Sequence, residues 1–165
     1  MDNLKVVKPV VIAFTKVDLP WGWLGNMAPF PVEYEGKVWG TTEALFQSMR
    51  YNKENIKEII RKEVSPMGAK MKAKKYRDQY CVEPRSEEDV ENMIKCIKLK
   101  LEQHPQLVTK LKNSGDYLIV EDVTERIKKG SKTSALFWGA AKDKSGNWFG
   151  ENRLGKIWMD LRKEY

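Results

Sequence analysis

Apolar side chains recur at helical spacing along much of this chain. In "SEEDVENMIKCIKLKLEQH", residues 86–104, Ser86 is a favoured N-cap and acidic residues fill the first turn. The spacing predicts one long amphipathic helix with a buried stripe made of Val90, Met93, Ile94, Ile97 and Leu101. His104 stands before Pro105, a position that disfavours helical backbone, so we expect the helix to end there.

Shorter segments show the same periodicity. "NKENIKEIIRKEV" carries isoleucines at helical spacing, and the Ser-Pro pair that follows it suits the cap and first position of another helix. A further helix is expected at residues 105–115, where Gly115 would close it. After Asn152, a last helix would bury Leu154, Ile157, Trp158 and Leu161.

Strand patterns are fewer and shorter. Residues 6–14 and 116–123 are rich in β-branched and other apolar residues, which is typical of buried strands. "VEYEGKVW" alternates about Glu35-Gly36 and predicts a hairpin. The sequence has no repeat, low-complexity tract or linker. It therefore predicts a single compact domain over residues 1–165, mainly α-helical with a few short strands (α+β).

The segment "TTEALFQSMRY", residues 41–51, predicts a helix that carries a line of polar side chains. With Thr42 as the cap, Glu43, Gln47 and Arg50 would lie within about a sixth of the helix circumference. From the helix alone, a solvated stripe is the simpler interpretation, because carboxylates favour helix N-termini. A site that uses these side chains is the alternative.

Composition and charge narrow the class of protein. The chain has 165 residues, of which 41% are hydrophobic and 32% charged, as in folded globular proteins. No run approaches the length of a membrane span, the N-terminus lacks a signal-peptide cleavage pattern, and Cys81 and Cys96 have no metal-like spacing. We therefore expect a cytoplasmic protein.

The formal net charge of +7 favours an anionic partner, either a phosphate-bearing small molecule or a nucleic acid. Part of this excess lies in "KMKAKKYR", which begins at Lys70. This cluster, residues 70–77, is either a solvated surface or an anion-binding one.

The common catalytic motifs are missing. The chain has one histidine, His104, so neither a Ser-His-Asp triad nor a histidine metal site is favoured. It also lacks the glycine-rich phosphate-binding loop of nucleotide triphosphatases. Instead, tryptophans, amides and carboxylates stand in glycine-rich stretches such as "WGWLGNMAPF" and "ALFWGAAKDKSGNWFGENRLG". Such rings either pack in the core or stack on a base and its ribose. Gly155, in a first helical turn, would permit close approach of another element or of a ligand.

Several of these stretches also resemble one family. "WLGNMAPFPVEYEGKVWGTTEALFQSMRY" resembles the opening motif of the NADAR superfamily (YbiA-like proteins), in which a loop and a hairpin lead to a helix with S/T-S/T-E-x-x-x-Q. "SPMGAKMKAKKY", "FWGAA" and "GENRLGKIWMDLR" follow in the family's order. The similarity extends from roughly Phe14 to Arg162, nearly the whole chain.

The resemblance implies an N-glycosidase that needs no cofactor. Its substrate would be a base or amine joined to a phosphorylated ribose or ADP-ribose, either a riboflavin-pathway ribosylamino-pyrimidine or ADP-ribosylated guanine in nucleic acid. By motif match, Glu43 is the catalytic carboxylate. The residues that would contact the substrate are Asn26, Gln47, Trp138, Gly139, Asn152 and Gly155, with Arg50 and Lys70 as candidates for a phosphate.

One departure from the family's pattern leaves alternatives open. Ala135 stands where the family commonly has an Asp, so the work of that acid would pass to Glu121, Asp122 or Glu151, or be absent. A module of the same fold that binds ADP-ribose, NAD or nucleic acid without turnover is therefore a second interpretation. A basic nucleic-acid-binding domain that uses residues 70–77 is a third.

Overall fold

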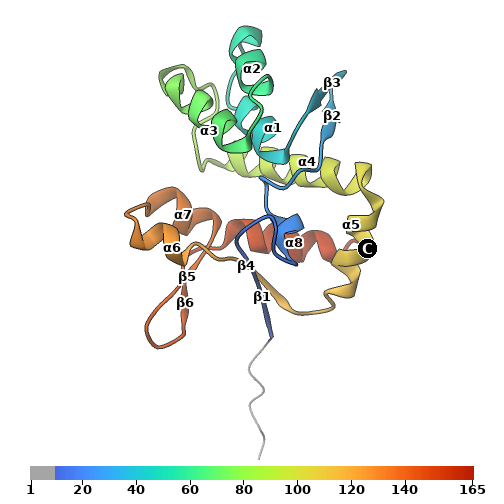
Figure 1. The fold of residues 1–165 in the computed structure, drawn as a ribbon, viewed down its shortest axis with the longest axis vertical. Helices are drawn as coiled ribbons and strands as arrows, with labels where there is room; N and C mark the ends of the chain where they lie inside the picture. Colours follow the sequence, from blue (N-terminus) through green and yellow to red (C-terminus); the bar gives the residue numbers. More distant parts are fainter. Residues whose placement is uncertain (1–9) are drawn as a thin grey trace, which may run out of the picture. The chain divides into compact units, whose positions relative to one another are not determined.

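The computed structural model describes residues 10–165, which form two compact units. We call residues 16–110 the central unit, and residues 10–15 with 111–165 the terminal unit. Helices dominate and the strands are short, as the sequence predicts (Figure 1). The chain passes between the units after Thr15 and within α5 (Pro105–Asn113).

The central unit is built around its longest helix, α4 (Glu87–Gln103). Figure 1 shows α1, α2, α3 and the β2–β3 hairpin on one side of this helix. In chain order, the other elements are η1 (Gly22–Leu24), β2 (Val32–Tyr34), β3 (Lys37–Trp39), α1 (Thr42–Ser48), α2 (Glu54–Arg61), α3 (Pro66–Lys75) and η2 (Arg77–Gln79).

Local sequence signals account for several of these boundaries. Glu35 and Gly36 take positive φ angles of 51° and 78°, as a tight hairpin turn requires, and the predicted β2–β3 hairpin is confirmed. Ser65 accepts a hydrogen bond from the backbone of Gly68 at 2.9 Å, and Pro66 opens α3 as predicted.

Helix α1 is buried on every side, since all of its residues from Thr42 to Ser48 are buried. The predicted cap, Thr42, is wrong by one residue: Thr41 has extended backbone, and its hydroxyl accepts from the Ala44 amide at 3.2 Å. Thr42 is instead the first helical residue. Arg50 lies just beyond the C-cap, Met49, so the polar line runs off the end of the helix.

Helix α4 begins at the predicted Ser86 cap and ends before His104, and Met93, Ile97 and Leu101 of the predicted stripe are buried. Val90 and Ile94 are only half-buried. The fully or nearly fully buried residues are Asp89, Met93, Cys96, Ile97, Lys100 and Leu101. The apolar pattern was misleading because two charged residues, Asp89 and Lys100, occupy the buried face.

The terminal unit pairs two distant strands. β1 (Val11–Phe14) runs parallel to β4 (Leu118–Glu121), a pairing that the separate strand patterns did not predict. Residues 6–9 of the predicted first strand lie outside the described residues. The remaining elements are α6 (Thr124–Lys128), α7 (Thr133–Trp138), β5 (Ala141–Lys142), β6 (Trp148–Phe149) and α8 (Arg153–Arg162), of which the sequence predicted only the last.

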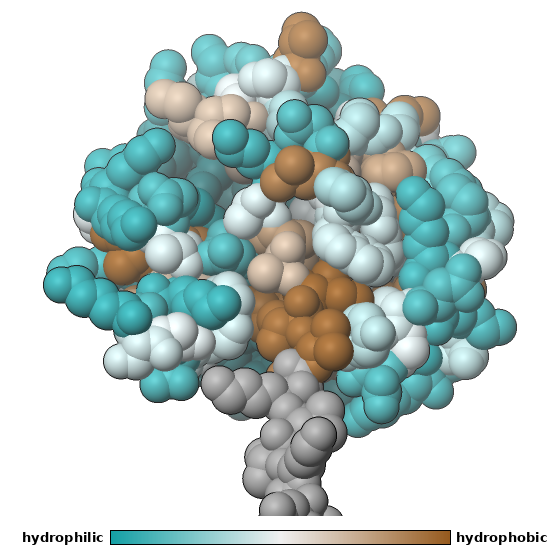
Figure 2. All heavy atoms as spheres, turned by 60° about the horizontal axis from the view of Figure 1, so that its bottom comes forward, coloured by the Kyte–Doolittle hydropathy of each residue, from teal (hydrophilic) through white to brown (hydrophobic). Residues whose placement is uncertain are grey.

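Some apolar surface lies near the start of this sheet. Figure 2 shows brown, hydrophobic atoms beside the grey residues. Val10 and Leu118 are exposed there, and the Leu118 amide donates to the Val10 carbonyl at 3.0 Å.

Within residues 10–165, no helix combines the length and the apolar character needed to cross a membrane.

Helix α8 lies against β4 at a point where only glycine fits. A Cβ atom added to Gly155 would stand 2.2 Å from the carbonyl oxygen of Ile119. Asn152, just before α8, holds the same strand through its side chain, which accepts from the Glu121 amide at 3.1 Å and donates to the Ile119 carbonyl at 2.9 Å. The sequence left open whether Gly155 approaches a neighbour or a ligand, and the structure shows the neighbour.

We expect Gly155→Ala to lower the free energy of unfolding by at least about 2 kcal/mol, because the strand backbone cannot move aside. Gly40→Ala is the matched control, since a Cβ at Gly40 meets nothing within 4 Å. Urea unfolding of both variants measures the difference. An equal, small effect of the two substitutions would contradict the close approach.

Candidate active site

The predicted site residues in and just after α1 form a buried chain of hydrogen bonds in the central unit. Glu43, Gln47 and Arg50 are exposed by only 8%, 6% and 8%. The Gln47 amide nitrogen donates to Oε1 of Glu43 at 2.9 Å. Arg50 donates from Nη1 to Oε1 of Gln47 at 3.4 Å, a long bond. The solvated-stripe interpretation is therefore wrong, because these side chains face the interior.

Arg50 is also held from α4. Its Nε and Nη2 each donate to one carboxylate oxygen of Asp89, both at 2.9 Å, and Asp89 is fully buried. Burial opposes the charge of Arg50, but the hydrogen bonds and the charge of Asp89 outweigh it and raise the pKa of the guanidinium. The guanidinium also lies 4.8 Å from the Phe46 ring centre. Nε and Nη2 of Arg50, which the sequence predicts to bind a phosphate, therefore bind Asp89 instead.

The loop before the hairpin meets the start of α1. The carbonyl of Asn26 accepts from the Glu43 amide at 3.0 Å, and the Asn26 side chain donates to the Met93 sulfur at 3.2 Å. Oδ1 of Asn26 and Oγ1 of Thr42 are both buried, and neither has a hydrogen-bond partner among the described residues. Acceptors and hydroxyls without partners are uncommon in a protein interior, so the surroundings of Glu43 retain hydrogen-bonding capacity.

Lys100 of α4 binds the same loop, and its side chain is fully buried. Its ammonium donates to the carbonyls of Trp23 at 2.6 Å and Gly25 at 3.1 Å. It also stands 5.3 Å from the Phe30 ring centre. Burial lowers the pKa of Lys100 to about 7, since a low-polarity interior disfavours the charged form.

The remaining motif residues belong to the terminal unit, where the structure shows packing contacts for each. Trp138 is 7% exposed and meets Phe137 edge-on at 4.8 Å between ring centres. A Cβ on Gly139 would lie 2.5 Å from the Glu121 carbonyl. Asn152 and Gly155 hold α8 against β4, as described above.

The other acids and cations named from the sequence differ in their surroundings. Asp122 accepts from the Thr124 hydroxyl at 2.6 Å and from its amide at 3.0 Å, which fixes the turn into α6. Glu151 forms an exposed ion pair with Arg153. Glu121, half-buried, has a carboxylate oxygen 3.1 Å from the Cβ position of Gly139. Lys70 is half-buried on α3.

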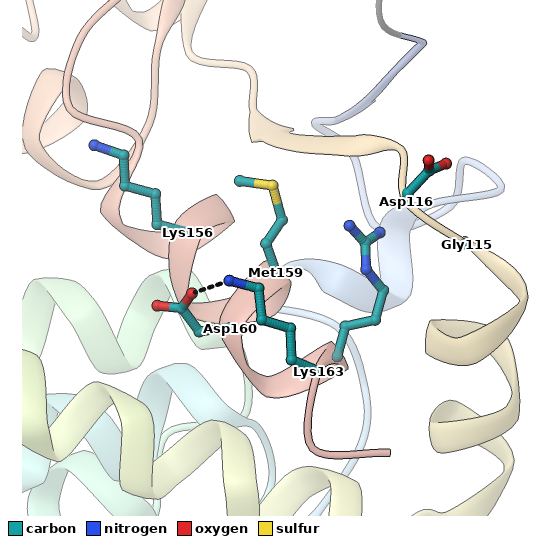
Figure 3. Close-up of a pocket in the computed structure, with 7 residues that line it drawn as sticks. Gly115, Asp116, Lys156, Met159, Asp160 and Lys163 are labelled. Atoms are coloured by element: carbon teal, nitrogen blue, oxygen red, sulfur yellow. Dashed lines mark ion pairs between the residues drawn. The ribbon is translucent and has the colours of Figure 1, made fainter.

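A pocket on the terminal unit contains none of the predicted site residues. It is lined by Lys156, Met159, Asp160, Arg162 and Lys163 of α8 together with Gly115 and Asp116. Figure 3 shows Lys163 paired with Asp160, at 3.7 Å. Over residues 10–165, no three His, Cys, Asp or Glu side chains gather as metal ligands do.

The sequence does not indicate a role at this site for three residues of the central unit. They are Asp89, which binds Arg50, Lys100, which binds the loop before the hairpin, and Thr42, which precedes Glu43. Asp89 lies in the first turn of a predicted helix, where acidic residues are common, so it does not stand out. Lys100 does not stand out because other lysines lie close to it in the sequence. The sequence predicts Thr42 only as the helix cap. Only the fold reveals that Asp89 and Lys100 point inward.

Comparison with known proteins gives the same family. The NADAR domain family model matches residues 13–165. N-glycosidase YbiA of Escherichia coli (strain K12) is 30% identical over 161 residues, covering 96% of this chain and 91% of that protein. N-glycosidase Npun_R5314 of Nostoc punctiforme is 26% identical over 163 residues, covering 94% of this chain and 92% of the relative.

Structural similarity agrees. The NMR structure of Escherichia coli YbiA has a TM-score of 0.76 with this structure at 29% identity, covering 96% of this chain and 86% of that one. The chain therefore belongs to the NADAR family, as its motifs predicted. With these relatives it falls among the hydrolases that act on N-glycosyl bonds.

The buried Lys100 predicts an unusual dependence of stability on pH. The unfolded chain binds this proton with the ordinary pKa of 10.5, whereas the folded protein releases it near 7. Between those values the unfolded state holds more protons, so stability rises with pH by up to about 1.4 kcal/mol per unit. We expect the wild type to gain stability relative to Lys100→Met from about pH 7 to about pH 10.

Urea unfolding across that range tests this expectation. Lys98→Met, exposed on the same helix, is the control and should keep the pH profile of the wild type. Parallel profiles for the wild type and Lys100→Met would show that the ammonium keeps its proton in the folded protein.

Proposed function

We propose that this protein hydrolyses the N-glycosidic bond between a base or amine and a phosphorylated ribose or ADP-ribose, with Glu43 as the catalytic carboxylate. The observation that carries the proposal is the burial of Glu43 beside unsatisfied polar atoms. Among residues 10–165, its Oε1 accepts from Gln47 while its Oε2 has no donor. A carboxylate held at one oxygen presents the other in a defined direction.

The chemistry needs one carboxylate of this kind. As the bond between the ribose carbon C1′ and the nitrogen breaks, C1′ gains positive charge and the nitrogen takes up the electron pair and a proton. A carboxylate near C1′ stabilises that charge, and it can also accept a proton from the attacking water. Oε2 of Glu43 suits either role, and both leave a base or amine and a free ribose hydroxyl at C1′.

Asn26 and Thr42 would complete this part of the site. Their buried oxygens lack partners in the described structure, and a ribose hydroxyl or the attacking water would satisfy them. Lys70 remains a candidate for the substrate phosphate. Trp138, Gly139, Asn152 and Gly155 remain candidates by motif match. The resemblance to NADAR proteins suggests two substrate classes: ribosylamino-pyrimidine phosphates and ADP-ribosylated guanine in nucleic acid.

The deciding experiment is product analysis of the wild type and Glu43→Gln with three substrates: a ribosylamino-pyrimidine phosphate, DNA with ADP-ribosylated guanine, and NAD. We expect the wild type to release a base or ribose phosphate from one of them. Glu43→Gln should be slower by about 100-fold or more, because it lacks the negative charge that the transition state requires. Glu54→Gln, which removes an exposed carboxylate, is the control.

Each outcome separates the interpretations. Equal rates for the wild type and Glu43→Gln would reject Glu43 as the catalytic group. Binding of ADP-ribose without any product would favour the alternative, a non-catalytic binding module. Binding to unmodified DNA that weakens steeply with salt would favour the basic nucleic-acid-binding domain.

Thr42 permits a test that separates stability from activity. A buried hydroxyl without a partner costs free energy, so Thr42→Val should be as stable as the wild type or more stable by about 1 kcal/mol. If the hydroxyl serves the site, the same variant should lose about tenfold in kcat/KM. Thermal unfolding and initial rates measure the two effects. Full activity in Thr42→Val would remove this residue from the site.

A further inference from the structure

We propose that the buried Arg50–Asp89 pair is a positioning device for Glu43 that acts through the side-chain amide of Gln47. The inference rests on the proposed function, because it assigns Arg50 and Asp89 a part in the same reaction. Neither residue needs to touch the substrate. The pair connects α4 with the end of α1, and every contact in the argument lies within the central unit.

Asp89 first fixes the guanidinium. Its two oxygens accept from Nε and Nη2 of Arg50, both at 2.9 Å, which defines the plane of the group. Asp89 is itself held, since Oδ2 accepts from the Arg85 amide at 2.8 Å and the backbone amide of Asp89 donates to the Ser86 hydroxyl at 3.2 Å. The remaining nitrogen, Nη1, then points to Gln47.

Arg50 in turn selects one of the two orientations of the Gln47 amide. With Oε1 toward Arg50 and Nε2 toward Glu43, both contacts join a donor to an acceptor. After a flip, the NH₂ group would face the guanidinium and the carbonyl would face the carboxylate, so both contacts would be repulsive. A buried amide between a cation and an anion therefore has one stable orientation.

The oriented amide determines which oxygen of Glu43 is available. Nε2 of Gln47 occupies Oε1 at 2.9 Å, and this leaves Oε2 for the reaction. Without the guanidinium, the amide could rotate and the carboxylate would lose its fixed direction. Small displacements of a catalytic group lower the rate far more than they lower substrate affinity. The pair should therefore affect kcat rather than KM.

The test is a double-mutant cycle on the substrate that the wild type cleaves. Asp89→Asn preserves the size of the side chain but removes its charge, and we expect kcat to fall about tenfold or more with KM changed less than about threefold. If Asp89 acts through Gln47, adding Asp89→Asn to Gln47→Met should lower kcat no further. Glu58→Gln, which breaks an ion pair with Lys37, is the matched control and should keep full activity.

Two results would overturn the proposal: kcat of Asp89→Asn within twofold of the wild type, or losses that multiply in the double variant, as a general loosening of the fold would produce. Thermal unfolding identifies variants that fail to fold. If Asp89→Asn is one of them, Arg50→Lys takes its place in the cycle, because a lysine keeps the charge but cannot bind Asp89 and Gln47 in the same geometry.

A second readout does not depend on activity, so failure of the proposed function stays distinguishable. In ¹⁵N-labelled protein, Gln47→Met identifies the side-chain NH₂ signals of Gln47. We expect their exchange with solvent to be slow in the wild type and about tenfold or more faster in Asp89→Asn. Unchanged exchange would refute the positioning role even if no tested substrate is cleaved.

Discussion

The central unit depends on one face of α4, where charged and apolar residues are buried together. Asp89, Met93, Cys96 and Lys100 follow one another at intervals of three or four residues, so they lie along a single stripe. Asp89 binds Arg50, Met93 meets Asn26, Cys96 meets Met49, and Lys100 binds the loop carbonyls. This one helix therefore fixes both α1 and the loop that meets it.

Buried charges of this kind add little to the net free energy of unfolding. Removing two ions from water costs several kcal/mol per ion, and well-packed apolar residues often serve a fold equally well. Their value lies in direction, because a guanidinium with two bonds to a carboxylate has one geometry, whereas apolar contacts tolerate many. Arg50 and Asp89 hold Gln47, which binds Glu43. Lys100 holds the loop that meets the Glu43 amide. Such supports are what a site with strict geometric requirements would need.

The sequence predicted elements better than it predicted neighbours. Local signals, such as the Ser86 cap, the Ser65-Pro66 start and the Glu35-Gly36 turn, depend on residues close in the chain, and the structure confirms them. Glu43 and Gln47 were identified as a pair because helical spacing joins them. Asp89 and Lys100 were not, since an apolar pattern treats a charge as exposed and only the fold shows its partner. The short helices α6 and α7 lacked periodicity long enough to detect.

The parallel pairing of β1 with β4 also has a consequence for synthesis of the chain. β1 leaves the ribosome before the central unit, but its partner, β4, follows only after that unit. Val11 therefore stays unpaired until Leu118 has been synthesised. A ribosome adds about 5–20 residues per second, whereas helices and hairpins form within microseconds. The central unit can therefore fold while β1 is still unpaired, and the terminal unit forms only after β4 has been synthesised.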